Sequence, residues 1–160
     1  MGIDIIIEIP KNSRIKYEKD ELTGKIRCDR YLKTPFNYPY NYGYIPNTLA
    51  PDNDPIDVFV LMDEPLYPGT IISVTILGAF EMIDNGESDD KMIAIPSEKL
   101  NFPEKYTVIE NGKKVIEKKF LDEIKFFLEN YKKLEEKEVV IKGYMDADDA
   151  NALVTKYQLD

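Results

Sequence analysis

The residues best suited to chemistry form an acidic turn that runs directly into an apolar segment. Asp52, Asp54 and Asp57 follow a D-x-D-x-x-D spacing, and Pro55 stiffens the backbone between them. Three carboxylates held this close repel one another, so the cluster is sustainable at neutral pH when divalent cations lie among them. The spacing therefore indicates a hard-metal site at the mouth of a strand. A solvated acidic turn is an equal alternative on this segment alone.

A second acidic segment brings Asp84, Asp89 and Lys91 together around Gly86. Carboxylates beside an ammonium group can hold both a cation and a phosphate oxygen. Taken alone, however, this segment is better interpreted as the tip of a hairpin.

Residues 36–46 contain a dense run of Tyr with Pro and Gly. The run is too polar and too rich in turn residues to predict a core strand. We expect a segment that packs its rings at the mouth of the fold and presents hydroxyl groups to an anion. A surface loop pinned by aromatic packing is a nearly equal alternative.

The composition narrows the chemistry further. The 160 residues include no His and a single Cys, which excludes His-ligated zinc, Ser–His or Cys–His catalysis and an internal disulfide. Acidic residues outnumber basic ones by 30 to 21, for a net charge of −9. Such a chain is poorly suited to hold nucleic acid or an anionic membrane unaided. Carboxylates, Lys, Arg and Tyr remain, and they suit oxygen-binding cations and phosphates.

The N-terminal segment predicts a cytoplasmic protein. It carries acidic residues where a signal peptide would be basic, and no small-residue cleavage site follows. No apolar run approaches the ~20 residues of a membrane span, so no membrane partner is expected.

A scaffold of short strands must position these segments. Strand patterns occur at residues 3–9, 14–19, 25–32, 57–62, 71–82, 91–95 and 138–144. Asn111-Gly112 predicts a hairpin that joins residues 106–110 to 113–116. Short antiparallel strands with frequent turns favour a closed barrel over a layered α/β sheet. Because no repeat or linker interrupts the chain, residues 1–160 are predicted to form one domain.

Two helices are expected to flank the barrel. Apolar residues recur at helical spacing from Phe120 to Leu134, which predicts an amphipathic helix over residues 117–135. Asp146 is expected to cap a short final helix whose Ala150, Leu153 and Val154 face inward. The predicted fold class is therefore mainly β with flanking helices (α+β).

Motifs throughout the chain resemble those of the soluble family I inorganic pyrophosphatases. The D-x-D-P-x-D-V signature of that family matches residues 52–58. Further matches are E-I-P at 8–10, K-Y-E at 16–18, D-R at 29–30, Y-P-x-N-Y-G-Y-I at 38–45, D-x-x-x-x-D-x-K at 84–91 and Y-K-x-L-E at 131–135. These motifs occur in the family's order and at similar separations, and together they extend through most of the chain.

The resemblance implies a role for each matching residue. Asp52, Asp57 and Asp89 resemble ligands of the tighter activating metal. Asp84 joins Asp89 around a metal that arrives with substrate, and Glu18 lies at the edge of the site. Asp54 resembles the general base, and the phosphate-binding set comprises Lys16, Arg30, Tyr42, Lys91, Tyr131 and Lys132. Arg30, Tyr42 and Lys91 are also expected to act in catalysis, while Glu8 and Tyr38 line the cavity.

The implied activity is that of an inorganic diphosphatase, which hydrolyses pyrophosphate to two orthophosphates. A water or hydroxide activated by several Mg²⁺ ions would attack phosphorus directly. The implied fold is a distorted five-stranded OB-like closed barrel, and prokaryotic members commonly assemble as homohexamers. The chain departs from the common bacterial pattern at Asn85 and in residues 106–119, and it lacks the His residues of some trimer interfaces.

Two other classes of function remain as alternatives. The barrel and the Tyr-rich segment suggest an OB-like module that binds single-stranded nucleic acid, although the acidity opposes this. The acidic turns suggest a calcium-binding protein, which would leave the basic residues Lys16, Arg30, Lys91 and Lys132 unexplained.

Overall fold

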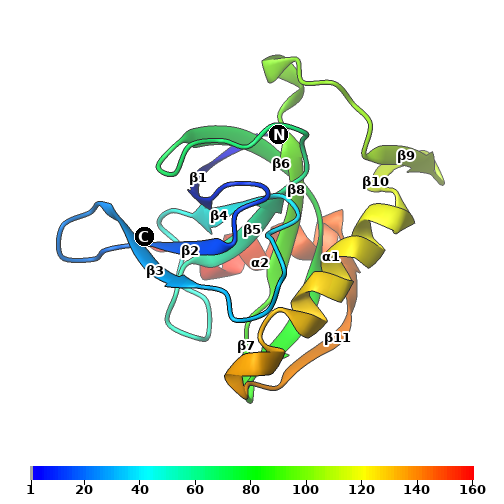
Figure 1. Cartoon of the computed structure of the whole chain (residues 1–160). Helices are drawn as coiled ribbons and strands as arrows, with labels where there is room; N and C mark the ends of the chain where they lie inside the picture. The colour runs from blue at the N-terminus through cyan, green and yellow to red at the C-terminus, as the bar shows by residue number, and fades with distance from the viewer. Residues whose placement is uncertain (1) are drawn as a thin grey trace.

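Five strands close into a ring at the centre of the computed structural model, which describes residues 2–160. The order around the ring is β1 (Ile3–Ile9), β4 (Asn41–Ile45), β5 (Ile56–Val60), β8 (Lys91–Pro96) and β6 (Ile71–Asp84). β6 then pairs back onto β1, with Ile3 opposite Val74 and Ile6 opposite Ile71. β11 (Val139–Asp146) extends the sheet beyond β6. The closed barrel expected from the sequence is confirmed (Figure 1).

One pair in the ring departs from the expected antiparallel pattern. β5 and β8 run parallel, with Asp57 opposite Lys91 and Val60 opposite Ala94. Parallel neighbours need a long crossover connection, and the long antiparallel strand β6 lies in the chain between them. The parallel pairing places the first residues of both strands, and hence Asp57 and Lys91, at one end of the barrel.

The core consists of two apolar clusters that share the strands of the barrel. Phe59 and Leu61 belong to the cluster that includes α1 (Lys118–Asn130). Val58 and Val60 belong to the cluster that includes Ala150 of α2 (Ala147–Tyr157). This alternation follows from the period of two along a strand. The barrel is therefore packed by both of its helices, which fixes the strand ends that carry the acidic turn.

The expectation that the Tyr-rich segment is no core strand is wrong. Residues Asn41–Ile45 form β4 between β1 and β5, and all five are buried. Tyr rings supply a large apolar body, and Tyr42 packs edge-on against Phe59 with ring centroids 4.8 Å apart. Gly43 lies against β1 so closely that a Cβ there would be 2.0 Å from the Ile6 carbonyl oxygen. The Tyr and Gly residues therefore make a tightly packed strand.

The first helix is shorter than predicted. α1 ends at Asn130, and residues Lys133–Glu135 form a separate 3₁₀ turn, η2, in which Leu134 is exposed. Glu136 then adopts a left-handed conformation with φ of 58°, which turns the chain toward β11. The final helix is confirmed, since the Asp146 carboxylate accepts a hydrogen bond from the Asp149 amide at 2.9 Å.

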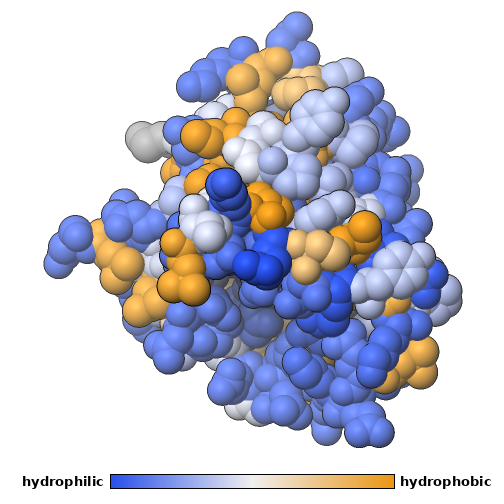
Figure 2. All heavy atoms as spheres, turned by 60° about the vertical axis from the view of Figure 1, so that its left-hand side comes forward, coloured by the Kyte–Doolittle hydropathy of each residue, from blue (hydrophilic) through white to orange (hydrophobic). Residues whose placement is uncertain are grey.

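Shorter elements lie outside the ring. β2 (Ile15–Lys19) and β3 (Ile26–Tyr31) form a two-stranded sheet of their own, and β9 (Thr107–Glu110) and β10 (Lys113–Ile116) form the predicted hairpin. The other two are β7 (Glu87–Ser88), which pairs with the end of β6, and the 3₁₀ turn η1 (Glu98–Leu100). Figure 1 shows the β2–β3 hairpin, in blue, extending outward from the ring. On that side the surface is mostly hydrophilic with scattered apolar residues (Figure 2). Neither helix is long and apolar enough to cross a bilayer.

Candidate active site

A cavity of about 670 Å³ opens at the end of the barrel where β5 and β8 begin. The residues that line it come from the ring strands, the β2–β3 hairpin, the acidic turns and the segment after α1. The predicted site residues among them are Glu8, Lys16, Glu18, Tyr38, Tyr42, Asp52, Asp54, Asp57, Asp84, Asp89, Lys91, Tyr131 and Lys132. The structure thus brings together every predicted site residue except Arg30.

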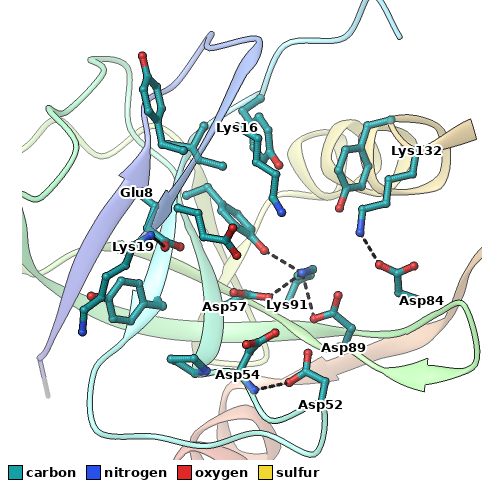
Figure 3. A pocket seen from close by; sticks show the side chains of 18 of the residues that line it. Glu8, Lys16, Lys19, Asp52, Asp54, Asp57, Asp84, Asp89, Lys91 and Lys132 are labelled. Carbon is teal, nitrogen blue, oxygen red and sulfur yellow. Dashed lines mark hydrogen bonds and ion pairs between the residues drawn. The ribbon is translucent and has the colours of Figure 1, made fainter. Parts of the chain in front are cut away.

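Lys91 lies at the centre of the cavity floor. Its ammonium Nζ donates to Asp57 Oδ2 at 2.7 Å, to Asp89 Oδ1 at 3.1 Å and to the Tyr42 hydroxyl at 2.8 Å (Figure 3). The Lys91 side chain is only 3% exposed. These three contacts use the full donor capacity of the ammonium group. The parallel register of β5 and β8 is what places Lys91 beside Asp57.

The charges of this group are set by burial and by one another. Burial would lower the pKa of Lys91, but Asp57, Tyr42 and Asp89 raise it well above its usual value, so the amine stays protonated at neutral pH. Burial raises the pKa of Asp57 despite its contact with Lys91. Burial also acts on Asp89, but there the charge and hydrogen bond of Lys91 prevail and its pKa is lowered. Lys91 therefore stabilises the ionised form of Asp89 more effectively than that of Asp57.

Two more carboxylates, Asp52 and Glu8, face the cavity without an ion pair like those that Lys91 makes. Burial, together with neighbouring carboxylates, raises the pKa of Asp52 to about 6. Burial likewise raises the pKa of Glu8 to about 7. Each accepts a hydrogen bond from a backbone amide, Asp52 from Asp54 at 3.1 Å and Glu8 from Lys19 at 2.9 Å. Because acidic side chains outnumber basic ones in the cavity lining, the cavity holds more negative charge than its basic residues neutralise.

The opposite wall of the cavity follows the end of α1. Lys132 Nζ donates to Asp84 Oδ2, while Asp84 Oδ1 is buried with no hydrogen-bond partner (Figure 3). Tyr131 stacks on Phe127 with ring centroids 4.6 Å apart, and its carbonyl accepts from the Thr34 hydroxyl at 3.0 Å. This wall supplies an aromatic hydroxyl and a cation that face the carboxylate group.

The acidic residues fit divalent cations, although the arrangement is not a finished metal cluster. Within residues 2–160, no three acidic side chains are placed as a ready set of ligands, and the Lys91 ammonium pairs with both Asp57 and Asp89. The donors are all carboxylate oxygens, which hard divalent cations prefer. The unpartnered Asp84 Oδ1 and the raised pKa of Asp52 both indicate negative charge that a cation would compensate.

Arg30 lies beside the cavity and does not line it. It is opposite Lys16 in the β2–β3 register, and its Nη1 donates to Asp29 Oδ2 at 2.7 Å. Its Nη2 is 2.9 Å from Glu135 Oε1. Neither Asp29 nor Glu135 was assigned a role from the sequence, although both belong to the matching D-R and Y-K-x-L-E motifs. Their places in those two motifs are the sequence feature that could have identified Asp29 and Glu135 as site residues.

Comparison with known proteins identifies the family to which this chain belongs. The family model described as inorganic pyrophosphatase matches residues 5–159. The inorganic pyrophosphatase of Mycoplasma genitalium is 46% identical over 144 residues, which are 90% of this chain and 76% of the relative. That of Halalkalibacterium halodurans is 43% identical over 152 residues, covering 95% and 90%. A solved inorganic pyrophosphatase from Helicobacter pylori superposes with a TM-score of 0.88 at 38% identity, covering 98% of this chain and 91% of that one. The chain therefore belongs to the inorganic pyrophosphatase family.

Proposed function

We propose that this protein hydrolyses inorganic pyrophosphate to two orthophosphates with Mg²⁺ held among the cavity carboxylates. The observation that carries the proposal is the convergence of Asp52, Asp57 and Asp89 with Lys16 and Lys132 around one cavity. Pyrophosphate is a small polyanion, and a chain with a net charge of −9 would repel it unaided. Cations among the carboxylates reverse that repulsion locally.

Family membership brings a requirement for a divalent cation, and we assign Mg²⁺, several ions per site, as the finer identity. We assign Asp52, Asp57, Asp84 and Asp89 as the residues that hold it, with Glu18 at the edge. When bound, Mg²⁺ would neutralise phosphate oxygens and make the attacking water more acidic.

The chain's own residues then bind and orient the substrate. Lys16 and Lys132 reach the cavity from different elements, β2 and the segment after α1, so their ammonium groups would hold two different oxygens of the same polyanion. The donors of Lys91 are all engaged by protein groups, and they would turn to a phosphate oxygen once cations hold its carboxylate partners. The hydroxyls of Tyr42 and Tyr131 lie beside these lysines and would orient the leaving phosphate.

Asp54 is the residue we assign as general base. It lines the cavity at the end of the acidic turn, beside Asp52 (Figure 3). Its carboxylate would take the proton of the attacking water, so the displacement needs no covalent phosphoenzyme. Hydrolysis in ¹⁸O-enriched water should then place one solvent oxygen in one of the two product phosphates.

The direct test is phosphate release from pyrophosphate with Mg²⁺ and with EDTA. We expect release with Mg²⁺, none with EDTA, and recovery when Mg²⁺ is restored. Absence of release under all three conditions would overturn the proposal. A salt-dependent gel shift with single-stranded DNA tests the nucleic-acid alternative, which the comparisons do not support.

Three further expectations complete the proposal. The single domain over residues 1–160, the cytoplasmic location and the homohexamer rest on the sequence and on family resemblance. Light scattering on the purified chain measures the assembly, and a mass of six protomers is the expected result.

A further inference from the structure

Arg30 and Glu135 join two elements that are otherwise separate. Arg30 belongs to β3, whose sheet contains only β2 and β3, and Glu135 is the last residue of the η2 turn. Arg30 Nη2 lies 2.9 Å from Glu135 Oε1, and their side chains are 29% and 10% exposed. The contact therefore links the hairpin to the segment that follows α1.

The Arg30 guanidinium is held by protein partners, but not all of its hydrogen-bond donors are used. Only Nη1 makes a well-aligned hydrogen bond, to Asp29. Nε and Nη2 are buried without a hydrogen-bond partner, and so is Glu135 Oε2, although the two charged groups are in ion-pair contact. A guanidinium carries five donors in a rigid fork that suits phosphate oxygens. Arg30 thus has donors that its protein partners do not use.

Glu135 is placed to control the cavity wall without facing the cavity. It follows Tyr131 and Lys132 in the chain, and its amide donates to the Lys132 carbonyl at 2.9 Å. It is not among the residues that line the cavity. On the hairpin side, Asp29 accepts from Arg30 and lies 3.9 Å from Lys16 Nζ. Glu135 is therefore connected to Lys16 through Arg30 and Asp29, and to Lys132 through the backbone of its own turn.

We propose that Glu135 is a positioning residue for pyrophosphate hydrolysis. It holds the Arg30 guanidinium beside the cavity and keeps the β2–β3 hairpin aligned with the Tyr131–Lys132 segment. The basic side chains of the two elements can then approach the same phosphate group. This inference rests on the proposed function, and it adds a residue that acts through Arg30 rather than on the substrate.

The test compares Glu135→Gln with Glu138→Gln in the full-length protein at saturating Mg²⁺. The first change removes the charge but keeps the shape, and the second removes a charge from a nearby exposed side chain. We expect Glu135→Gln to raise KM for pyrophosphate about tenfold, the size of a lost charge-assisted contact, with kcat within about twofold. Affinity for methylenediphosphonate, measured by calorimetry, should fall by the same factor. The Glu138→Gln control should match the wild type.

A double-mutant cycle separates positioning from a general structural effect. In an Arg30→Ala background, Glu135→Gln should change KM and analogue affinity by less than about twofold, because the partner through which it acts is gone. An equal loss in both backgrounds, or wild-type behaviour of Glu135→Gln, would overturn the inference. If Glu135→Gln folds poorly, Glu135→Asp provides the same comparison with the charge retained and the reach shortened. If the wild type releases no phosphate, the proposed function fails, and the cycle on analogue affinity still decides the role of Glu135.

Discussion

Two of the regions that carry basic residues in or beside the cavity are built differently. At the barrel end, Lys91 of β8 pairs with Asp57 of the adjacent strand β5 and with Asp89 of the turn before β8, with hydrogen bonds of 2.7 and 3.1 Å and almost no exposure. The β2–β3 hairpin holds Lys16 and Arg30 on a sheet of two strands, with both side chains partly exposed. The barrel end is fixed by closed pairing and core packing, whereas the hairpin relies on a few polar contacts.

This difference separates two parts of the chemistry. The carboxylates that we assign to metal binding and proton transfer lie at the closed end of the barrel, where a small displacement of reacting groups would be costly. Lys16 and Arg30, which we assign to phosphate binding, lie on the hairpin, where Arg30 is in ion-pair contact with Glu135. Changes at the barrel end should therefore impair chemistry and stability, and changes on the hairpin should mainly impair substrate affinity.

The largest expected effect is on chemistry at the barrel end. Asp54→Asn should lower kcat by about 10²–10⁴, the usual contribution of a general base. Mg²⁺ affinity, measured by calorimetry without substrate, should stay near the wild-type value, because we assign the metal to other carboxylates. Loss of metal affinity with little change in kcat would contradict this assignment.

Breaking the central ion group tests the rigidity of the barrel end. Lys91→Met leaves Asp57 and Asp89 without their shared cation, so we expect a loss of about 3–5 kcal/mol in the free energy of unfolding in EDTA. Lys16→Met on the hairpin is the matched control and should cost about 1 kcal/mol or less, because its ion pair is long and partly exposed. Urea unfolding of both variants measures the contrast, and similar losses would remove the distinction between the regions.

A substitution of one carboxylate at the barrel end tests metal affinity. Asp57→Asn keeps an acceptor for Lys91 but removes a metal-holding charge, so the Mg²⁺ concentration for half-maximal activity should rise about tenfold or more. Activity measured across a Mg²⁺ titration checks this. An unchanged titration curve would argue that Asp57 holds no metal.

The smallest expected effect concerns the junction between the hairpin side and α1. Thr34→Val removes the hydroxyl that donates to the buried Tyr131 carbonyl, which should cost about 1 kcal/mol of stability, the usual net contribution of one hydrogen bond. KM should rise modestly because Tyr131 and Lys132 lose one anchor, and kcat should change little. Thermal unfolding and steady-state kinetics measure both, and a fall in kcat without a change in KM would contradict the assigned role.

Local patterns in the sequence predicted much of the fold. Strand composition identified most of the ring, the Asn111-Gly112 hairpin is present, and Asp146 caps the last helix. β4 was missed because Tyr and Gly signal a loop locally, whereas here the rings supply core volume and Gly43 permits close contact with β1. The parallel β5–β8 pair depends on contacts between distant segments, which residue spacing does not specify.

The candidate site likewise has a part that the sequence predicted and a part that it did not. The acidic spacing at residues 52–57 and the resemblance to family motifs indicated residues that do converge. The position of Arg30 outside the cavity lining, and its contact with Glu135, could not be predicted, because they depend on how a detached hairpin meets the end of α1. The end of α1 at Asn130 could not be predicted either, because apolar residues continue at helical spacing to Leu134.

The central claim is that cations among the carboxylates make room for a polyanion in an acidic protein. Calorimetry of methylenediphosphonate binding to the wild type, in Mg²⁺ and in EDTA, tests it most directly because no turnover is involved. We predict clear binding with Mg²⁺ and no measurable binding in EDTA. Equal affinity under both conditions would contradict the claim.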